Sequence, residues 1–285
     1  MNRYALIVLF ACTAFPAAAQ TPTVLKLQWK AGQVLTYAVK QTTSVEETIL
    51  QESTNKLVSG SNITTLNLTY TWTVTGVDAA GVATLEKRIT AFRQENQRKT
   101  QEKDGKPATD SDVLDSSVAA DLAKMPFLNK VAVTAKVDAS GAVLDVQSEF
   151  GDAAKDRFKT ELPFRMTLSD KPLTANLTWD RAFKVALDPK FGGTGESYDA
   201  VQTSTYKGMN GAFAVFGVAT KLKSPPTAAN ELRPLVPLLW EGDVYFNVQT
   251  GQYHACKLAA TKEFVNHEGD GTKFKYASEY VESLK

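Results

Sequence analysis

Apolar and polar residues alternate along most of the chain after its first twenty positions. One polar residue separates each apolar residue from the next in the clearest case, which comprises Leu66, Leu68, Tyr70, Trp72 and Val74. A period of two places such side chains on one face of a strand, with the other face in water. Turn residues at 76–81 and an apolar stretch at 82–92 then predict a hairpin.

The same pattern continues to the end of the chain. Residues 131–137 and 142–146 predict a second hairpin, and further alternating segments between about 173 and 281 are separated by turns rich in Gly, Asp and Asn. We therefore expect a mainly β fold of antiparallel curved sheets, with one or two short covering helices. The strands form either one domain or two similar lobes.

One segment has helical spacing instead. Its apolar residues recur three or four positions apart, at Leu114, Val118, Leu122 and Met125. Because Pro126 ends this pattern, we expect a helix near residues 112–125, packed on a sheet or docked to a membrane or partner. The polar stretch before it, from 94 to 107, predicts a solvated loop or the exposed tips of two strands.

The chain is long enough for one large domain or two small ones, because it has 285 residues. Pro163 and Pro172 lie near its midpoint. We expect an N-terminal β-rich lobe over residues 20–165 and a C-terminal β-rich lobe over residues 166–285. In the alternative arrangement, the two lobes pack together as one domain.

The first nineteen residues have the pattern of a secretory signal peptide. Arg3 precedes an apolar run from Tyr4 to Phe15, and small residues follow up to Ala19. The run is shorter than the roughly 20 residues that cross a bilayer. We expect cleavage between Ala19 and Gln20, and a periplasmic or extracellular location.

Cys12 raises the alternative of a lipid anchor. The segment from Leu9 to Cys12 loosely matches a lipoprotein box, but Phe10 fits that box poorly and the apolar stretch before Cys12 is short. These mismatches disfavour lipidation at Cys12. No later apolar run reaches 18 residues, so no transmembrane segment is expected once the signal is removed.

Charge and composition narrow the function. Lys and Arg number 32 against 31 for Asp and Glu, a balance that argues against a nucleic-acid partner. The hydrophobic content of 43% argues against disorder. Two cysteines are too few for a disulfide scaffold or a zinc module.

The search for catalytic and metal-binding groups finds little. His254 and Cys256 share a face of an expected strand, and His267 is a conceivable third ligand. An ordinary strand is the favoured interpretation, because a closed zinc site needs about four ligands. The glycine-rich stretch at 192–197 lacks the Lys-Ser/Thr end of a phosphate loop. We expect no catalytic residue, no metal and no cofactor.

One apolar run lies in an apparent loop. Its members are Leu235, Val236, Leu238, Leu239 and Trp240. Loops seldom carry so much apolar surface unless it packs or binds. The run is therefore interpreted as a plug over an open end of the sheet, or as the surface that contacts a lipid, another apolar ligand or an envelope protein partner.

A short motif opens the expected mature chain. Residues 27–33 read Leu-Gln-Trp-Lys-Ala-Gly-Gln, and residues 177–180, Leu-Thr-Trp-Asp, look like a variant of its opening. A Gly-centred turn follows in each half. This pattern resembles a family of exported bacterial β-rich proteins of unknown function. The resemblance implies an envelope location and a β-rich fold, and it implies no activity and no catalytic residues.

Three functional hypotheses follow. The first is an exported cell-envelope protein that is non-catalytic and serves as a binding or structural module. The alternative is a periplasmic carrier of a lipid or other apolar ligand, which rests on residues 235–240. The third is an enzyme that uses scattered carboxylates.

Overall fold

The protein is mainly β, as the alternation predicts. The computed structural model describes residues 24–51, 53, 55–101, 107–148, 166–187 and 195–285. The strands of the first half are β1 (Val34–Gln51), β2 (Lys56–Val77), β3 (Ala83–Gln101), β4 (Pro107–Asp115), β5 (Val131–Val137) and β6 (Val143–Gln147). Those of the second half are β7 (Thr178–Ala186), β8 (Ser197–Asn210), β9 (Phe213–Leu222), β10 (Glu241–Asn247), β11 (Gln252–Val265) and β12 (Lys273–Leu284).

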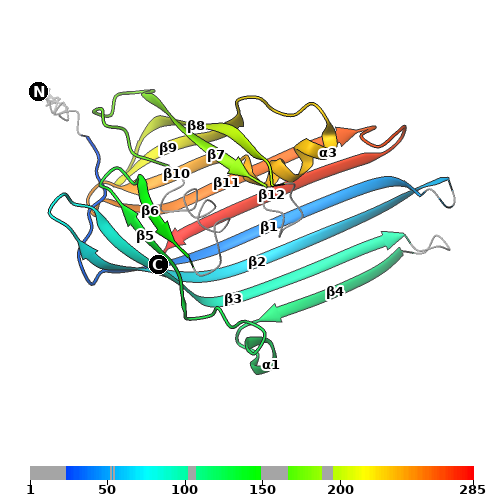
Figure 1. Cartoon of the computed structure of the whole chain (residues 1–285), viewed down its shortest axis with the longest axis horizontal. Coiled ribbons are helices and arrows are strands. Elements are labelled where there is room, and N and C mark those ends of the chain that lie inside the picture. The colour runs from blue at the N-terminus through cyan, green and yellow to red at the C-terminus, as the bar shows by residue number, and fades with distance from the viewer. Residues whose placement is uncertain (1–23, 52, 54, 102–106, 149–165, 188–194) are drawn as a thin grey trace, which may run out of the picture.

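All twelve strands belong to one curved antiparallel sheet (Figure 1). Its order is β6-β5-β3-β2-β1-β12-β11-β10-β9-β8-β7, and β4 pairs with the outer part of β3. Neighbours in space are almost always neighbours in sequence, because tight turns join antiparallel strands. The exceptions are the pair of β3 with β5, between which β4 intervenes in the chain, and the pair of β1 with β12, which joins the two halves of the chain.

The predicted hairpins are present. Val74 lies opposite Leu85 in the pair of β2 and β3, and Ala135 lies opposite Val146 in the pair of β5 and β6. Within the polar stretch at 94–107, residues 94–101 form the outer end of β3 and Pro107 begins β4, in agreement with the expected exposed ends of two strands. Each hairpin is local, so the alternation and the turn residues suffice to define it.

The core lies on the concave face of the sheet. Trp72 and Val74 of β2 and Leu85 of β3 are fully buried, as the two-residue period requires. The same apolar cluster takes in Phe216 of β9 and Val244 of β10, so both halves of the chain share it. Each large apolar side chain buried there contributes about 1.5–3 kcal/mol.

A row of polar side chains crosses the same face beyond the core. Strand register places its members directly opposite one another, in the order Ser278, Thr43, Thr64, Asn96 and Asp112. Thr43 Oγ1 lies 2.8 Å from Ser278 Oγ, Thr64 Oγ1 donates to Asn96 Oδ1 at 2.9 Å, and Asn96 Nδ2 donates to Asp112 Oδ2 at 2.9 Å. These bonds satisfy polar groups that the curved sheet partly buries.

Within the described residues there are two short α-helices, α1 (Ala119–Leu122) and α3 (Ala229–Leu232), and α3 continues into the 3₁₀ helix η2 (Arg233–Leu238). The helix expected near residues 112–125 is much shorter, because β4 occupies the segment up to Asp115. Val118 and Leu122 are 48% and 44% exposed, and α1 lies beyond the β4 edge of the sheet (Figure 1). Pairing with β3 overrides the helical spacing here. Among the described residues, no helix is both long and apolar enough to cross a bilayer.

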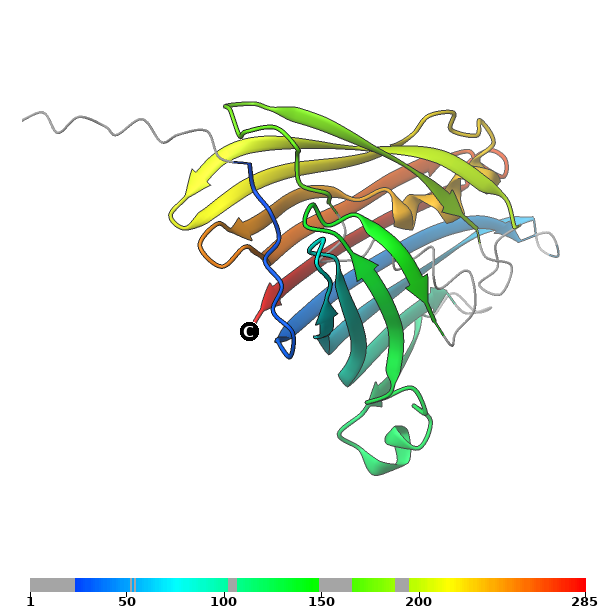
Figure 2. The ribbon, with the colours of Figure 1, turned by 60° about the vertical axis from the view of Figure 1, so that its left-hand side comes forward.

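The segment of residues 24–33, which we name the strap, crosses the strand ends on one side of the molecule (Figure 2). The Leu27 amide donates to the Ala139 carbonyl at 2.8 Å, and the Gln28 amide donates to the Gly251 carbonyl at 2.9 Å. Because Ala139 lies in the β5–β6 turn and Gly251 in the β10–β11 turn, the strap bridges the two halves of the sheet. Leu27 is buried in the shared core beneath it.

Candidate functional site

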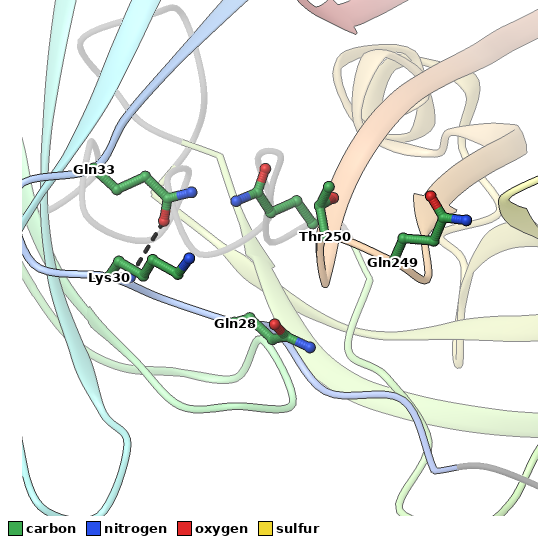
Figure 3. Close-up of a pocket in the computed structure, with 6 residues that line it drawn as sticks. Gln28, Lys30, Gln33, Gln249 and Thr250 are labelled. Atoms are coloured by element: carbon green, nitrogen blue, oxygen red, sulfur yellow. Dashed lines mark hydrogen bonds between the residues drawn. The ribbon is translucent and has the colours of Figure 1, made fainter.

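A pocket of about 420 Å³ opens where the strap meets the β10–β11 turn. Six residues line it, three from the strap and three from the turn and the start of β11: Gln28, Lys30, Gln33, Gln249, Thr250 and Gln252 (Figure 3). We name this site the amide pocket, because four of its six lining residues are glutamines.

The β10–β11 turn is held by the side chain of Asn247. Its Oδ1 accepts hydrogen bonds from the amides of Gln249 at 2.9 Å and Thr250 at 3.2 Å. Asn side chains commonly organise turns in this way. Gly251 completes the turn at a φ of +64°, a conformation that glycine adopts without strain. The turn therefore presents Gln249 and Thr250 from a defined backbone.

The other wall of the pocket is a tight turn of the strap. The Gln33 amide donates to the Lys30 carbonyl at 3.0 Å, and the Lys30 amide donates to Gln33 Oε1 at 3.3 Å. Because Gln33 Oε1 accepts this bond, the side-chain nitrogen of Gln33 points toward the opposite wall (Figure 3). The Lys30 ammonium extends in the same general direction (Figure 3).

Several lining groups are available to a ligand. Within the described part of the chain, the side-chain amides of Gln28, Gln249 and Gln252 make no hydrogen bond, and Lys30 forms no ion pair. Gln252 is only 9% exposed. The side-chain amide of Gln252 nevertheless reaches solvent, and Gln28, Lys30, Gln249 and Thr250 are exposed, so these groups are open to water or to a ligand.

The lining offers hydrogen-bonding groups and one ammonium group. A glutamine side chain offers two N–H donors and one carbonyl acceptor. Proton transfer in enzymes uses His, Asp, Glu, Lys, Tyr or Cys, and Lys30 is the one lining residue of that kind. Thr250 would need an adjacent base to act as a nucleophile, and the six lining residues include no histidine and no carboxylate.

The apolar run at 235–240 lies elsewhere on the concave face. Leu235 is fully buried in an apolar cluster with Val185 and Ala200, and Val236 packs with Ala260 and Phe274 in a second cluster. The remaining members, Leu238, Leu239 and Trp240, are half-buried. None of the five residues lines the amide pocket. The structure therefore brings the run together but separates it from the pocket.

The histidine and cysteine residues do not converge. His254 stacks on Phe213 at 4.5 Å between ring centres, and Cys256 is buried. A β-bulge at His254 breaks the alternation that would have given these two residues a common face. His267 lies beyond the other end of β11. Across the described residues, no group of three His, Cys, Asp or Glu side chains is placed to hold a metal ion.

His267 belongs to a separate polar cluster. Its side chain is 1% exposed, and its Nε2 lies 3.7 Å from Glu268 Oε1 and 4.0 Å from Glu47 Oε1. Arg233 of η2 bridges these carboxylates, at 2.6 Å to Glu47 and 3.1 Å to Glu268, and its guanidinium lies 4.1 Å from the Phe274 ring centre. The cluster ties η2, and hence residues 235–240, to the tips of β1 and β12.

Two predicted features lie outside the described residues. They are the signal segment with its cleavage site at Ala19 and Gln20, including Cys12, and the glycine-rich stretch as far as residue 194.

The amide pocket was not predicted from the sequence. Its two walls lie near opposite ends of the chain, and glutamine carries no catalytic or metal-binding signature. The Leu-Gln-Trp-Lys-Ala-Gly-Gln motif at 27–33 was the available signal, since it contains all three lining residues of the strap. No protein-family model matches the chain, and a comparison with curated proteins finds no match.

Proposed function

We propose that the protein is an exported, non-catalytic binding protein of the cell envelope, and that it holds a polar small molecule in the amide pocket. The observation that carries this proposal is the convergence of four glutamines and one lysine, from two segments far apart in the chain, on one pocket. Ligand sites use a small number of placed polar groups to orient a ligand, and this pocket supplies such groups from two walls.

The absence of a proton-transfer pair from the lining favours binding over catalysis. Amides neither gain nor lose protons in the physiological range, so Gln28, Gln33 and Gln249 can position a ligand without transforming it. Lys30 adds one positive charge.

Export is compatible with this site. The expected cleavage between Ala19 and Gln20 would leave residue 20 as the first residue of the mature chain, so the strap would stay intact. The strap is the first described segment, and the pocket needs it. A signal that extended through Gln33 would remove three of the six lining residues.

Native mass spectrometry of the protein purified from its own envelope tests the proposal. We expect a small polar adduct that is lost in Gln252→Ala and retained in Gln147→Ala, an exposed glutamine of β6 that serves as the control. An adduct of lipid mass that persists in Gln252→Ala would contradict the proposal and favour the apolar carrier. A turnover product that depends on one carboxylate would contradict the non-catalytic part.

A further inference from the structure

We infer that the ligand of the amide pocket carries a single carboxylate that pairs with Lys30, together with hydroxyl or amide groups that bond to the glutamines. This inference rests on the proposed function and adds the chemical class of the ligand to it.

The charge of the lining indicates the charge of the ligand. Lys30 is the one charged residue among the six, and within the described chain its ammonium has no ion-pair partner. A cationic ligand would be repelled by this charge. An anion would gain a charge-assisted hydrogen bond, which is shorter and stronger than a neutral one. The pocket therefore selects a neutral or anionic ligand, and its free charge favours the anion.

The hydrogen-bond donors and acceptors of the lining indicate which polar groups the ligand carries. Each glutamine contributes two N–H donors, and Lys30 adds three more. One of the carbonyl acceptors, Gln33 Oε1, is already engaged by the Lys30 amide. Each glutamine balances its two donors with the two lone pairs of its carbonyl oxygen, so the excess of donors comes mainly from Lys30 and favours a ligand with acceptor oxygens.

The number of charges distinguishes a carboxylate from a phosphate. A phosphate monoester carries a charge of about −1.5 to −2 at neutral pH. One ammonium would leave part of that charge to be met only by neutral amides, whose hydrogen bonds are weaker than those of an ion pair. A carboxylate carries one negative charge, which Lys30 matches. The remaining donors then serve uncharged oxygens of the ligand.

The position of the pocket adds a structural consequence. Its lining comes from the strap and from the β10–β11 turn, which the hydrogen bond from the Gln28 amide to the Gly251 carbonyl already joins. A ligand held by both walls adds further links between them. Binding should therefore slow hydrogen exchange at the amides of Leu27 and Gln28, because exchange there requires the strap to lift.

Matched pairs of probes test the inference on the mature full-length chain. Gluconate is compared with glucitol, and N-acetyl-Ala-Ala with its C-terminal amide, so that each pair differs in the carboxylate. Glucose 6-phosphate represents the phosphate class. Side-chain NH₂ resonances of the glutamines in ¹⁵N-labelled protein report binding at this pocket, and hydrogen exchange at Leu27 reports the strap.

We expect at least one acid to bind about tenfold or more tightly than its neutral counterpart and than glucose 6-phosphate. This preference should vanish in Lys30→Gln and persist in Lys130→Gln, an exposed lysine away from the pocket. If an acid and its neutral partner bound equally, or if glucose 6-phosphate bound more tightly, the inference of a carboxylate ligand would be wrong. The proposal that the pocket binds a polar molecule would be unaffected. Failure of both acids to shift the glutamine resonances would also overturn the inference of a carboxylate ligand. Failure of the proposed function is recognised separately, by a native adduct that Gln252→Ala does not remove.

Discussion

The Tyr37 hydroxyl donates a hydrogen bond to the backbone carbonyl of Tyr253 at 3.0 Å, across the width of β12. The Tyr253 hydroxyl in turn donates to the carbonyl of Met166, in the segment that precedes β7. Both tyrosines are buried. The two bonds therefore join β1, β11 and the approach to β7 inside the curved sheet, at the level where the strap crosses it.

Replacing Tyr37 with Phe should destabilise the protein by about 1 kcal/mol, the net value of a typical intramolecular hydrogen bond. The ring and its stacking on Tyr70, at 5.4 Å between centres, would be kept. Urea denaturation measures the effect. Tyr245→Phe is the control, because Tyr245 is half-buried and makes no hydrogen bond through its hydroxyl within the described chain. Equal stability of the two variants would argue against the bond.

The same tyrosines predict a loss of stability at alkaline pH. Burial raises the pKa of Tyr37 well above its usual value of 10.0, and the Glu282 carboxylate adds to the shift. Burial likewise raises the pKa of Tyr253. Because the unfolded chain ionises first, this contribution to stability is complete below pH 10.0 and is lost as the pH rises above it.

Denaturant unfolding at increasing pH, with tyrosinate absorbance as a second readout, checks this dependence. The folded protein should keep part of its tyrosines un-ionised until it unfolds. Tyr37→Phe should lose stability with pH less steeply than the unchanged protein. Full ionisation at pH 11 with the fold intact would show that these hydroxyls are not buried as described.

Gly251 should be intolerant of a side chain. Its φ is +64°, and a Cβ atom there would lie 2.5 Å from Cγ of Gln28 and 2.8 Å from its Cβ. Gly251→Ala is therefore expected to displace the strap, to accelerate hydrogen exchange at Gln28 and to weaken ligand binding. Gly81→Ala is a matched control, with a φ of +81° and no heavy atom within 4 Å. It should cost only the backbone strain of about 1–2 kcal/mol and leave the strap protected.

Leu235 should contribute strongly to stability. This residue of η2 is fully buried against Val185 and Ala200 of the sheet, so Leu235→Ala is expected to cost about 2–5 kcal/mol. Leu144→Ala, at a position 58% exposed, should stay within about 0.5 kcal/mol of the unchanged protein. Thermal unfolding followed by circular dichroism measures both. A small effect at Leu235 would indicate that the 235–240 segment lifts from the sheet.

Asp115 should titrate far below an ordinary carboxyl. The hydrogen bond from the Ser117 amide and the Arg93 guanidinium, at 2.8 and 2.7 Å, lower the pKa of Asp115 from 3.8 to about 2. A depressed pKa means that the contribution to stability is present above pH 3.8 and is lost as the pH falls through about 2. Carboxyl-carbon NMR should show this, and Arg93→Gln should raise the midpoint. An unchanged titration midpoint of Asp115 in Arg93→Gln would show that Arg93 does not lower this pKa.

The sequence predicted the strands well where both partners are close in the chain. Residues 66–74 face the core at every second position because a strand alternates its side chains. The turn at 76–81 then brings β3 back alongside β2. Leu114, Val118 and Leu122 show the limit of this reasoning. Their helical spacing is real, but the edge of β3 offers backbone hydrogen bonds and the Asn96–Asp112 contact, so the chain remains extended to Asp115.

What the sequence determined by itself was the local structure: the β-strands, their buried faces and most of their hairpins, because these follow from side-chain periodicity and turn residues. What only the tertiary structure decided was the pairing of β1 with β12, the path of the strap and the amide pocket between Gln28 and Gln252. These arise when curvature of the whole sheet brings the two ends of the chain together. Polar residues at such a junction carry no local pattern, since their partners are set by the folded sheet and not by their neighbours in sequence.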